Sequence, residues 1–320
     1  MTLTVVIPVL DEASRIGETI AAARAAAEAS PFETEVVVVD DGSTDGSGEA
    51  AEGAGARVVS QSNRGRFEAR RVGLAAARGE LVLFLDARVR LAPTALAFVA
   101  GNLELGRRVW NGHVVVESAG NPFGRFWDVV SALAFRRYFD EPRTTSFGSE
   151  DFDAYPKGTT CFFAPRELLE QAFDAFETRF ADVRRANDDT PLIRWIAGRE
   201  RIWISPEFAC SYGPPASLRR FLRHAFHRGV VFVDGHGRRE SSYRPVVLAF
   251  YPVSLAALAL AVWQPLAVPA LVVAVAGSAA LVAARQGRPR ADVASFALLA
   301  PVYGAAHGLG MWRALTLRRR

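Results

Sequence analysis

The chain has 320 residues, of which 50% are hydrophobic, and a formal net charge of +4. That length allows one large domain or two, and the basic charge comes without a nucleic-acid-binding module or separate basic tail, so a nucleic-acid partner is not indicated. Only Cys161 and Cys210 are present, and their spacing suggests neither a disulfide framework nor a zinc site.

The N-terminal part alternates short apolar runs with helical patterns. Glu35–Val39 predicts a buried strand, because a continuous β-branched run suits a parallel sheet covered on both faces. Strands alternating with helices indicate a Rossmann-like α/β sheet, mostly parallel, with helices on both faces. The other expected strands are Thr2–Pro8, Arg57–Ser60 and Glu80–Leu85, and the expected helices are Glu12–Ser30, Asp45–Gly53 and Phe67–Ala77.

The loop after Val39 is the most informative polar segment. Asp41, Ser43, Asp45 and Glu52 approach the spacing of an EF-hand calcium loop, but that loop needs a preceding helix, and the residues before it favour a strand. A second interpretation of this segment is a plain solvated turn. A third is a ligand pocket, because ligands of α/β sheets bind beyond the carboxyl ends of the strands.

Four motifs support the pocket. IPVLDE (Ile7–Glu12), VVDDGSTD (Val38–Asp45), NRG (Asn63–Gly65) and GELVLFLDAR (Gly79–Arg88), in this order, resemble the family 2 glycosyltransferases of the GT-A fold. The resemblance covers roughly residues 3–230 and implies a nucleotide-sugar donor. The residues that it implies for donor binding are Pro8, Leu10, Glu12, Asp40, Asp41, Asn63, Arg64, Asp86 and Arg88.

The sequence departs from the family at Asp86-Ala87-Arg88, where the family has Asp-x-Asp. In the family the second Asp usually coordinates a divalent metal. Mg²⁺ or Mn²⁺ could still bind through Asp86, donor phosphates and water. Alternatively, Arg88 neutralises the leaving diphosphate, or it points away and pairs on the surface.

An acidic pair marks the acceptor side. Asp188-Asp189, followed by a helical pattern, resembles the family segment whose Asp is the general base, which implies that role for Asp189. A sugar hydroxyl needs such a base. The alternative is a helix N-cap, and the two roles can coexist. Gly158–Pro165 would be the strand beneath the acceptor; the loop Ser146–Tyr155 offers Glu150, Asp151 and Asp153 as acceptor ligands or as a solvated acidic loop.

Two further segments combine basic and apolar residues in an amphipathic pattern. Ser217–Gly229 loosely resembles the family helix that clamps donor phosphates, which makes Arg223, His227 and Arg228 phosphate-binding candidates. A membrane-surface helix would have the same composition. Phe123–Phe139 is a candidate for lying on the membrane, with a core helix as the alternative.

The C-terminal part predicts a membrane region. The uncharged segments 246–263 and 266–284 are long enough to span, and 293–312 is a third candidate that spans or lies in the interface. Three spans would place Arg318–Arg320 outside, against the positive-inside rule, so two spans and one interfacial helix are favoured. The expected division is a catalytic domain over 1–235 and a membrane region over 236–320.

Together these patterns predict an inverting glycosyltransferase that faces the cytoplasm and is anchored in the cytoplasmic membrane. It would move a sugar, most simply from a UDP-sugar, to a hydroxyl of a lipid-linked acceptor in cell-surface glycan synthesis. The alternatives are a polyprenyl-phosphate glycosyltransferase and a non-catalytic assembly subunit. The sequence leaves the oligomeric state open.

Overall fold

The buried strands of the N-terminal part have two apolar faces. In the computed structural model, which describes residues 1–317, Val36 and Val38 of β2 (Glu33–Asp40) belong to the large core formed with α1 (Ala13–Glu28). Val37 and Val39 point to the opposite face and pack against Ala69 of α3 (Arg66–Ala76). A run of four valines is therefore used on both sides of the sheet, as a covered parallel strand requires.

The sheet has nine strands in the order β3-β2-β1-β4-β8-β6-β9-β5, with β7 paired to β9. β1 pairs in parallel with β2 and β4, and β2 with β3, so the parallel strands form one half of the sheet. The pairs β4–β8, β6–β8, β5–β9 and β7–β9 are antiparallel. The sheet is thus mixed, and its antiparallel half departs from the mostly parallel sheet that the sequence predicts. The remaining strands are β1 (Thr2–Val9), β3 (Arg57–Ser60), β4 (Leu81–Leu85), β5 (Val89–Leu91), β6 (Trp110–Val116), β7 (Thr145–Phe147), β8 (Cys161–Pro165) and β9 (Ile202–Tyr212).

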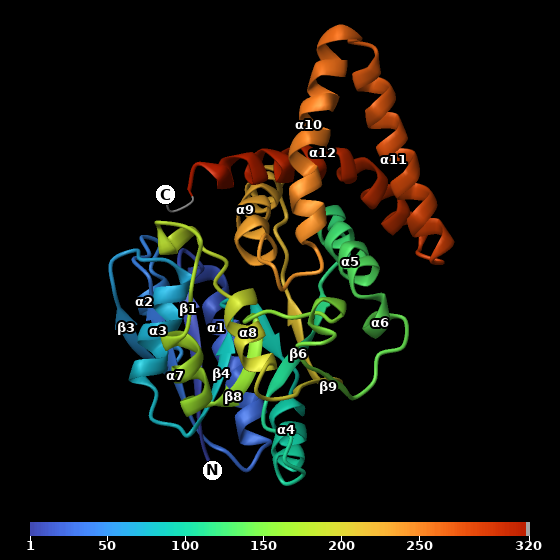
Figure 1. The fold of residues 1–320 in the computed structure, drawn as a ribbon. Helices are drawn as coiled ribbons and strands as arrows, with labels where there is room; N and C mark the ends of the chain where they lie inside the picture. Colours follow the sequence, from blue (N-terminus) through green and yellow to red (C-terminus); the bar gives the residue numbers. More distant parts are fainter. Residues whose placement is uncertain (318–320) are drawn as a thin grey trace. The chain divides into compact units, whose positions relative to one another are not determined.

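Helices cover both faces of this sheet (Figure 1). α1 and α4 (Ala95–Leu103) contribute to the large core on one face. On the other, Phe67 of α3 stacks on Phe173 of α7 (Arg166–Asp174), which also contacts Phe84 of β4. The α/β prediction with helices on both faces is confirmed. The other short elements are α2 (Ser47–Gly53), α6 (Arg136–Phe139), η1 (Phe152–Ala154), η2 (Val183–Arg185) and α8 (Thr190–Ala197).

Two segments differ from the sequence-based expectation. The amphipathic run 123–139 is not one helix, because Phe135, at φ −125° and ψ 43°, separates α5 (Pro122–Ala134) from α6. The segment 146–155 is not only a loop, since it contributes residues of β7 and the short helix η1. In both places the local structure depends on backbone hydrogen bonds and tertiary packing. The periodicity of apolar residues in the sequence does not predict these.

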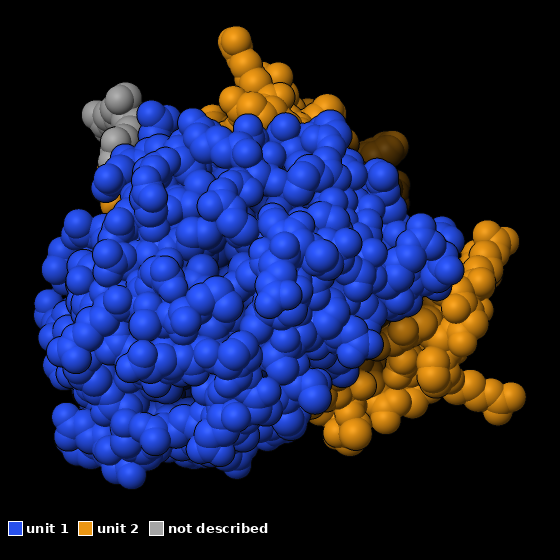
Figure 2. Space-filling model, turned by 90° about the horizontal axis from the view of Figure 1, so that it is seen from below, with its two compact units in different colours: residues 1–115, 135–177, 188–213 blue, residues 116–134, 178–187, 214–320 orange. Residues whose placement is uncertain are grey.

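The chain divides into two compact units (Figure 2). Unit 1 consists of residues 1–115, 135–177 and 188–213, and contains the sheet. Unit 2 consists of 116–134, 178–187 and the chain from 214 onward. The functional boundary expected at residue 235 stays a prediction; the compact units interleave along the chain instead of meeting at one point.

Unit 2 is built from long helices. α9 (Leu218–His236) packs along α12 (Arg290–Leu315), and Phe221 of α9, Phe126 of α5 and Phe296 of α12 meet in an aromatic cluster. The apolar face of α5 is therefore covered by helices of its own unit. α10 (Arg244–Trp263) and α11 (Ala267–Arg285) form an antiparallel hairpin, and α12 runs across its foot (Figure 1).

Among residues 1–317, three helices, α10, α11 and α12, are long and apolar enough to cross a membrane. Only 6% of the apolar window of α10 and 11% of that of α11 are buried within the protein, so the hairpin presents apolar side chains outward. Such a surface is unfavourable in water and matches a bilayer interior. The predicted spans are thereby matched by helices, while Arg318–Arg320 lie outside the described residues.

Candidate active site

The loops that follow β1 and β2 are joined to each other by hydrogen bonds. The Asp11 amide donates to Ser43 Oγ at 3.1 Å, and the Thr44 amide donates to Asp11 Oδ1 at 2.9 Å. The Ala13 amide donates to Asp45 Oδ2 at 3.0 Å. Asp11 adopts a left-handed φ of 52°, a conformation that Asp tolerates better than most residues. The polar residues of DDGSTD therefore order this largely exposed loop and tie it to the loop that follows β1.

The two adjacent carboxylates, Asp40 and Asp41, have different surroundings. Asp41 is 3% exposed, and accepts from Gln61 Nε2 at 2.6 Å and from the amides of Arg64 and Gly65 at 2.7 and 2.9 Å. Asp40 is half-buried and accepts from the Ser43 amide at 2.9 Å. Asp41 thus holds the NRG loop in place, a contact that the sequence analysis did not anticipate. Nucleoside binding by either carboxylate stays a prediction.

Behind the NRG loop, α3 supplies a buried guanidinium. Arg70 is 1% exposed; it donates to Asp86 Oδ1 at 2.7 Å and forms an ion pair with Asp188. Arg66, one turn earlier, lies 3.5 Å from Asp188 Oδ1. Burial alone would raise the pKa of Asp188, but the charges of Arg66 and Arg70 hold it at about 2. Asp188 is therefore an ionised anchor and not a proton carrier at neutral pH.

Asp189 occupies the N-cap of α8. Its Oδ1 accepts from the Thr190 amide at 2.5 Å and from Thr190 Oγ1 at 3.1 Å. Its Oδ2 faces Gly158, where a Cβ would come within 3.5 Å of that oxygen. The charges of Asp188, first, and also of Asp86 and Asp189 raise the pKa of Arg66. The three carboxylates Asp86, Asp188 and Asp189 are thus grouped around the arginines of α3. The N-cap interpretation of Asp189 is confirmed, and its catalytic role stays a prediction.

Arg88 forms an ion pair with Glu12, and both side chains are partly buried. Burial opposes its charge, yet the hydrogen bond and the charge of Glu12 raise the pKa of Arg88. Among residues 1–317, no group of three or more His, Cys, Asp or Glu side chains is arranged to hold a metal ion. Asp86 is the single carboxylate of the altered motif, and it is engaged by Arg70. The residues present do not assemble a ligand set for the divalent ion that the family motif implies.

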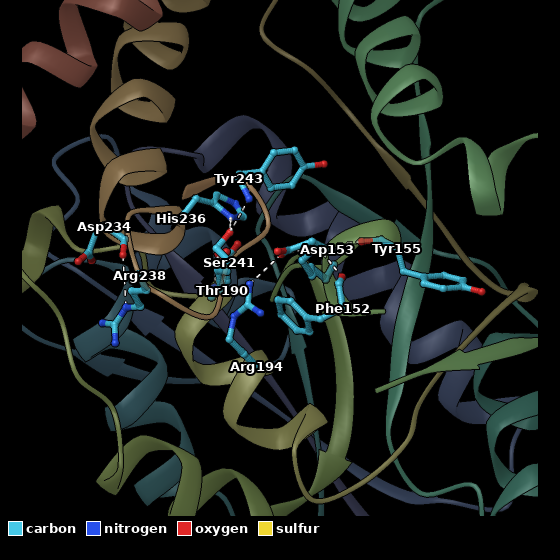
Figure 3. A network of polar contacts seen from close by, with 12 residues as sticks. Phe152, Asp153, Tyr155, Thr190, Arg194, Asp234, His236, Arg238, Ser241 and Tyr243 are labelled. Atoms are coloured by element: carbon cyan, nitrogen blue, oxygen red, sulfur yellow. Dashed lines mark hydrogen bonds and ion pairs between the residues drawn. The ribbon is translucent and has the colours of Figure 1, made fainter. Parts of the chain in front are cut away.

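The candidate acceptor loop is cross-linked by ion pairs. Asp153 accepts from Arg194 at 2.7 Å (Figure 3). Glu150 pairs with Arg201, and Asp151 accepts from the Gly148 amide at 2.9 Å. The loop is therefore ordered by its own acidic residues, and their role in acceptor binding stays a prediction.

The remaining predicted site residues lie in less informative places. Pro8 is buried within β1, whereas Leu10 and Asn63 are exposed. Arg64 pairs with Glu68 at 3.0 Å. The phosphate-binding candidates Arg223, His227 and Arg228 belong to α9 in unit 2, where the Arg228 guanidinium lies 5.1 Å from the Trp127 ring centroid; their phosphate role stays a prediction.

Sequence reasoning missed two members of the site, Arg66 and Arg70. Both lie on the helix after the NRG motif, four residues apart, which places them on one face. That spacing was the available signal, but a basic face on a helix usually indicates solvent exposure. Only the tertiary fold, which brings Asp86 and Asp188 to this face, shows that Arg70 is interior.

A protein-family model described as glycosyl transferase family 2 matches residues 4–173, more than half of the chain. Undecaprenyl-phosphate 4-deoxy-4-formamido-L-arabinose transferase of Pseudomonas fluorescens is 31% identical over 111 residues, 32% of this chain and 33% of the relative. Glucosyl-3-phosphoglycerate synthase of Mycolicibacterium paratuberculosis is 39% identical over 93 residues, 27% of this chain and 28% of the relative. The chain spans about a third of the length of these curated relatives.

The fold is similar to that of solved structures as well. A crystal structure of TarS from S. aureus has 20% sequence identity, and the match covers 73% of this chain and 67% of that chain with a TM-score of 0.50. At this identity the likeness concerns the fold alone. It agrees with the mixed α/β sheet described above and confirms the GT-A fold class that the sequence motifs predicted.

Proposed function

Because the chain belongs to glycosyltransferase family 2, we propose that it transfers a sugar from a nucleotide-sugar donor to a hydroxyl of a lipid-linked acceptor, with inversion at the anomeric carbon. The observation that carries the proposal is the grouping of Asp86, Asp188 and Asp189 around Arg66 and Arg70. This group lies where β4 ends and α8 begins, and ligands of α/β sheets bind at the carboxyl ends of the strands.

The chemistry assigns each carboxylate a different task. Asp189 takes the proton of the acceptor hydroxyl as its oxygen bonds to the anomeric carbon and the bond to the diphosphate breaks. Its Oδ1 accepts from the Thr190 amide, and its Oδ2, on the side of Gly158, is the oxygen assigned to receive that proton. Asp188, kept ionised by Arg66 and Arg70, fixes the start of α8 and so the position of its neighbour. Attack opposite to the leaving group inverts the configuration.

The donor lies, in this proposal, between the loops of the first two strands and Asp86. Asp40 and Glu12 provide acceptors for ribose hydroxyls and the base, and UDP-sugars are the first donors to test. Because the described residues do not assemble a ligand set for a divalent ion, we assign no step to one.

We further propose that α10 and α11 span the cytoplasmic membrane, with the catalytic residues on the cytoplasmic side, while α12 lies in the interface. Support comes from α9, which packs along α12 and carries Arg219, Arg220, Arg223 and Arg228. If α12 crossed the bilayer, these arginines would be drawn toward the hydrocarbon, at a cost of a few kcal/mol for each charge at the bilayer centre.

The first turn of α12 also carries charges. Asp292 accepts from Arg125 of α5 at 3.2 Å and from Arg288 at 2.9 Å, and Arg288 also pairs with Asp128. A network of four charges at the start of a helix suits the headgroup level of a bilayer better than its interior. The arrangement supports two spans and an interfacial helix.

A second candidate function is transfer to a polyprenyl phosphate. It is favoured by the names of curated relatives, which include undecaprenyl-phosphate and dodecaprenyl-phosphate sugar transferases. A phosphate is already ionised and needs no general base, so the two candidates differ in their need for Asp189. The product differs too, because mild acid releases the transferred sugar by itself from a polyprenyl phosphate, whereas a new glycosidic bond keeps that sugar attached to the acceptor.

The decisive experiment uses the full-length protein in detergent with a panel of nucleotide sugars, with and without Mn²⁺. Thermal stabilisation identifies the donor, and slow donor hydrolysis without acceptor shows that the protein is catalytic. Supply of a membrane lipid extract should then yield a lipid-soluble sugar product from which mild acid does not release the transferred sugar as a monosaccharide. Absence of binding and hydrolysis across the panel would support the non-catalytic subunit instead.

A further inference from the structure

The order of the parallel strands contains one reversal. From β1 the chain moves outward to β2 and β3, and then returns to β4 on the other side of β1. Ligands of doubly wound sheets bind in the crevice at such a reversal. Glu12 follows the end of β1, and Asp86 and Arg88 follow the end of β4. The Glu12–Arg88 ion pair therefore connects the two strand ends that flank this crevice.

The two partners match the two polar parts of a nucleoside diphosphate. A carboxylate accepts hydrogen bonds from ribose hydroxyls, and a guanidinium donates two parallel hydrogen bonds to phosphate oxygens. The Arg88 side chain is 27% exposed and that of Glu12 12%, so a ligand can reach the guanidinium without unfolding the loop. The ion pair thus places a cation and an anion where the donor requires an anion-binding and a hydroxyl-binding group.

The same position disfavours a divalent ion. Arg88 stands where the family has its second metal-binding Asp, so a positive charge occupies the place of a ligand. The remaining carboxylate, Asp86, already accepts from Arg70 at 2.7 Å. A cation at the altered motif would meet the positive charges of Arg70 and Arg88, and the motif's one carboxylate, Asp86, is already paired with Arg70.

Building on the proposed function, we infer that Arg88 replaces the metal: its guanidinium turns from Glu12 to the donor diphosphate, and donor binding requires no divalent ion. One anion then replaces another as the partner of Arg88, so the guanidinium keeps a partner throughout. Glu12, released from Arg88, is satisfied by the ribose hydroxyls. Through this change of partners, binding of the ribose by Glu12 is coupled to neutralisation of the diphosphate by Arg88.

The test is isothermal titration calorimetry of the full-length protein with UDP, and in parallel GDP and dTDP, in EDTA and in Mn²⁺. The wild type should bind one of these with the same dissociation constant in both buffers. R88M should weaken binding by about tenfold or more in both, as expected for loss of a charge-assisted hydrogen bond. R88K keeps the charge but not the two parallel hydrogen bonds, so its affinity should lie between those of the wild type and R88M.

A charge inversion gives the sharpest comparison. R88D restores the Asp-x-Asp pattern, so its nucleotide binding should be weak in EDTA and recover when Mn²⁺ is added. R90D is the matched control, because Arg90 is exposed on β5 and pairs with Glu18, and it should behave as the wild type in both buffers.

The results separate two failures. If the wild type binds a nucleotide at least tenfold more tightly in Mn²⁺ than in EDTA, or if R88M binds as the wild type does, the inference about Arg88 is overturned while the donor site stands. If the wild type, whose folding is verified by its unfolding transition, binds none of the three nucleotides in either buffer, the proposed function fails with it.

Discussion

Arg70 and Asp188 form a buried ion pair across 118 positions of the chain. The same guanidinium donates to Asp86 at 2.7 Å, so one side chain sets the spacing between the end of β4 and the start of α8. Because these two carboxylates lie beside the proposed base, the geometry of the site depends on a residue that need not touch the substrate.

Replacing Arg70 should damage both stability and activity. R70M leaves two carboxylates without their shared partner, and removal of one member of a buried ion pair typically costs 3–5 kcal/mol. Denaturant unfolding in detergent measures the loss, and donor hydrolysis should fall with it. R71M is the control, because Arg71 is exposed and pairs with Glu68 on the surface; its expected effect is below about 1 kcal/mol. Equal stabilities of R70M and R71M would contradict the assigned role.

The proposed base can be tested without disturbing the helix that carries it. Asn caps a helix about as well as Asp, so D189N should unfold within about 0.5 kcal/mol of the wild type. Transfer to a hydroxyl acceptor should fall by two or more orders of magnitude, the range for a missing general base. D182N serves as control, since Asp182 caps η2 in the same manner outside the active-site cluster. Retention of most activity in D189N would favour the polyprenyl-phosphate acceptor.

The parallel half of the sheet was predictable because its signals are local. Val36–Val39 favours a doubly covered strand, and the Asp-Gly-Ser cluster after it favours a loop at a strand end. The long-range partners were not predictable. Arg88 and Glu12 are 76 positions apart, and nothing near Arg88 in sequence shows whether it meets a carboxylate, a metal ligand or water.

The antiparallel half was the weaker prediction for a related reason. β8 was expected from its apolar run, but β6 and β9 carry mixed sequences whose pairing depends on strands distant in the chain. The membrane hairpin was predictable from length and hydropathy alone. The packing of α12 was not, because its glycines indicate helix weakness and close helix contact equally well.

A buried lysine should give the fold a distinctive pH dependence. The Lys157 side chain is 6% exposed and donates to the carbonyls of Phe152 and Tyr155 at 2.8 and 3.0 Å. Burial lowers its pKa from 10.5 to about 8, although the charge of Asp153 opposes the shift. Between these two values the unfolded chain holds a proton that the folded chain has released, so the free energy of unfolding rises with pH across this window.

The size of this rise is about 3 kcal/mol between pH 8 and pH 10.5, from the linkage between pKa and stability. K157M should remove it, whatever the variant's stability at neutral pH. The measurement is the difference in unfolding free energy between wild type and K157M over this range. If the two curves run parallel, Lys157 does not titrate as the burial of its side chain indicates.

In unit 2 a single carboxylate holds the segment that precedes the acidic pair. Asp234 of α9 is 0% exposed and accepts at 2.8 Å from Thr178 Oγ1 and from the amides of Arg179 and Asn187. D234A removes the acceptor of the buried Asn187 amide and of two partly buried donors, and a buried donor without an acceptor costs about 1–3 kcal/mol. The segment should open locally, and trypsin should cleave it faster after Arg179 and after its other arginines.

The control for this experiment is D182A. Asp182 lies in the same segment but is partly exposed and pairs with Arg184, so its loss removes a surface interaction. Trypsin sensitivity of D182A should stay within about twofold of the wild type, as expected when an exposed pair contributes less than about 1 kcal/mol. Equal cleavage of both variants would show that Asp234 does not hold the segment.

Close contact between α9 and α12 depends on glycine. A Cβ on Gly310 would overlap the carbonyl oxygen of Phe226 and lie 3.0 Å from the amide nitrogen of Val230, both on α9. Backbone atoms cannot move aside as a flexible side chain does, so G310A must push the helices apart. We expect a loss of about 1–3 kcal/mol, the range for overpacking a well-packed contact.

Gly304 provides the matched control on the same helix, because no atom lies within 4 Å of the position that its Cβ would take. G304A should be neutral or stabilising, since alanine favours a helix by up to about 1 kcal/mol over glycine. If both glycines only weakened α12, G304A and G310A would raise the free energy of unfolding by equal amounts. Unequal effects, measured as unfolding transitions in detergent, would instead show that the glycine at position 310 allows α12 to lie against the arginine-bearing α9, which is the contact that argues against a third span.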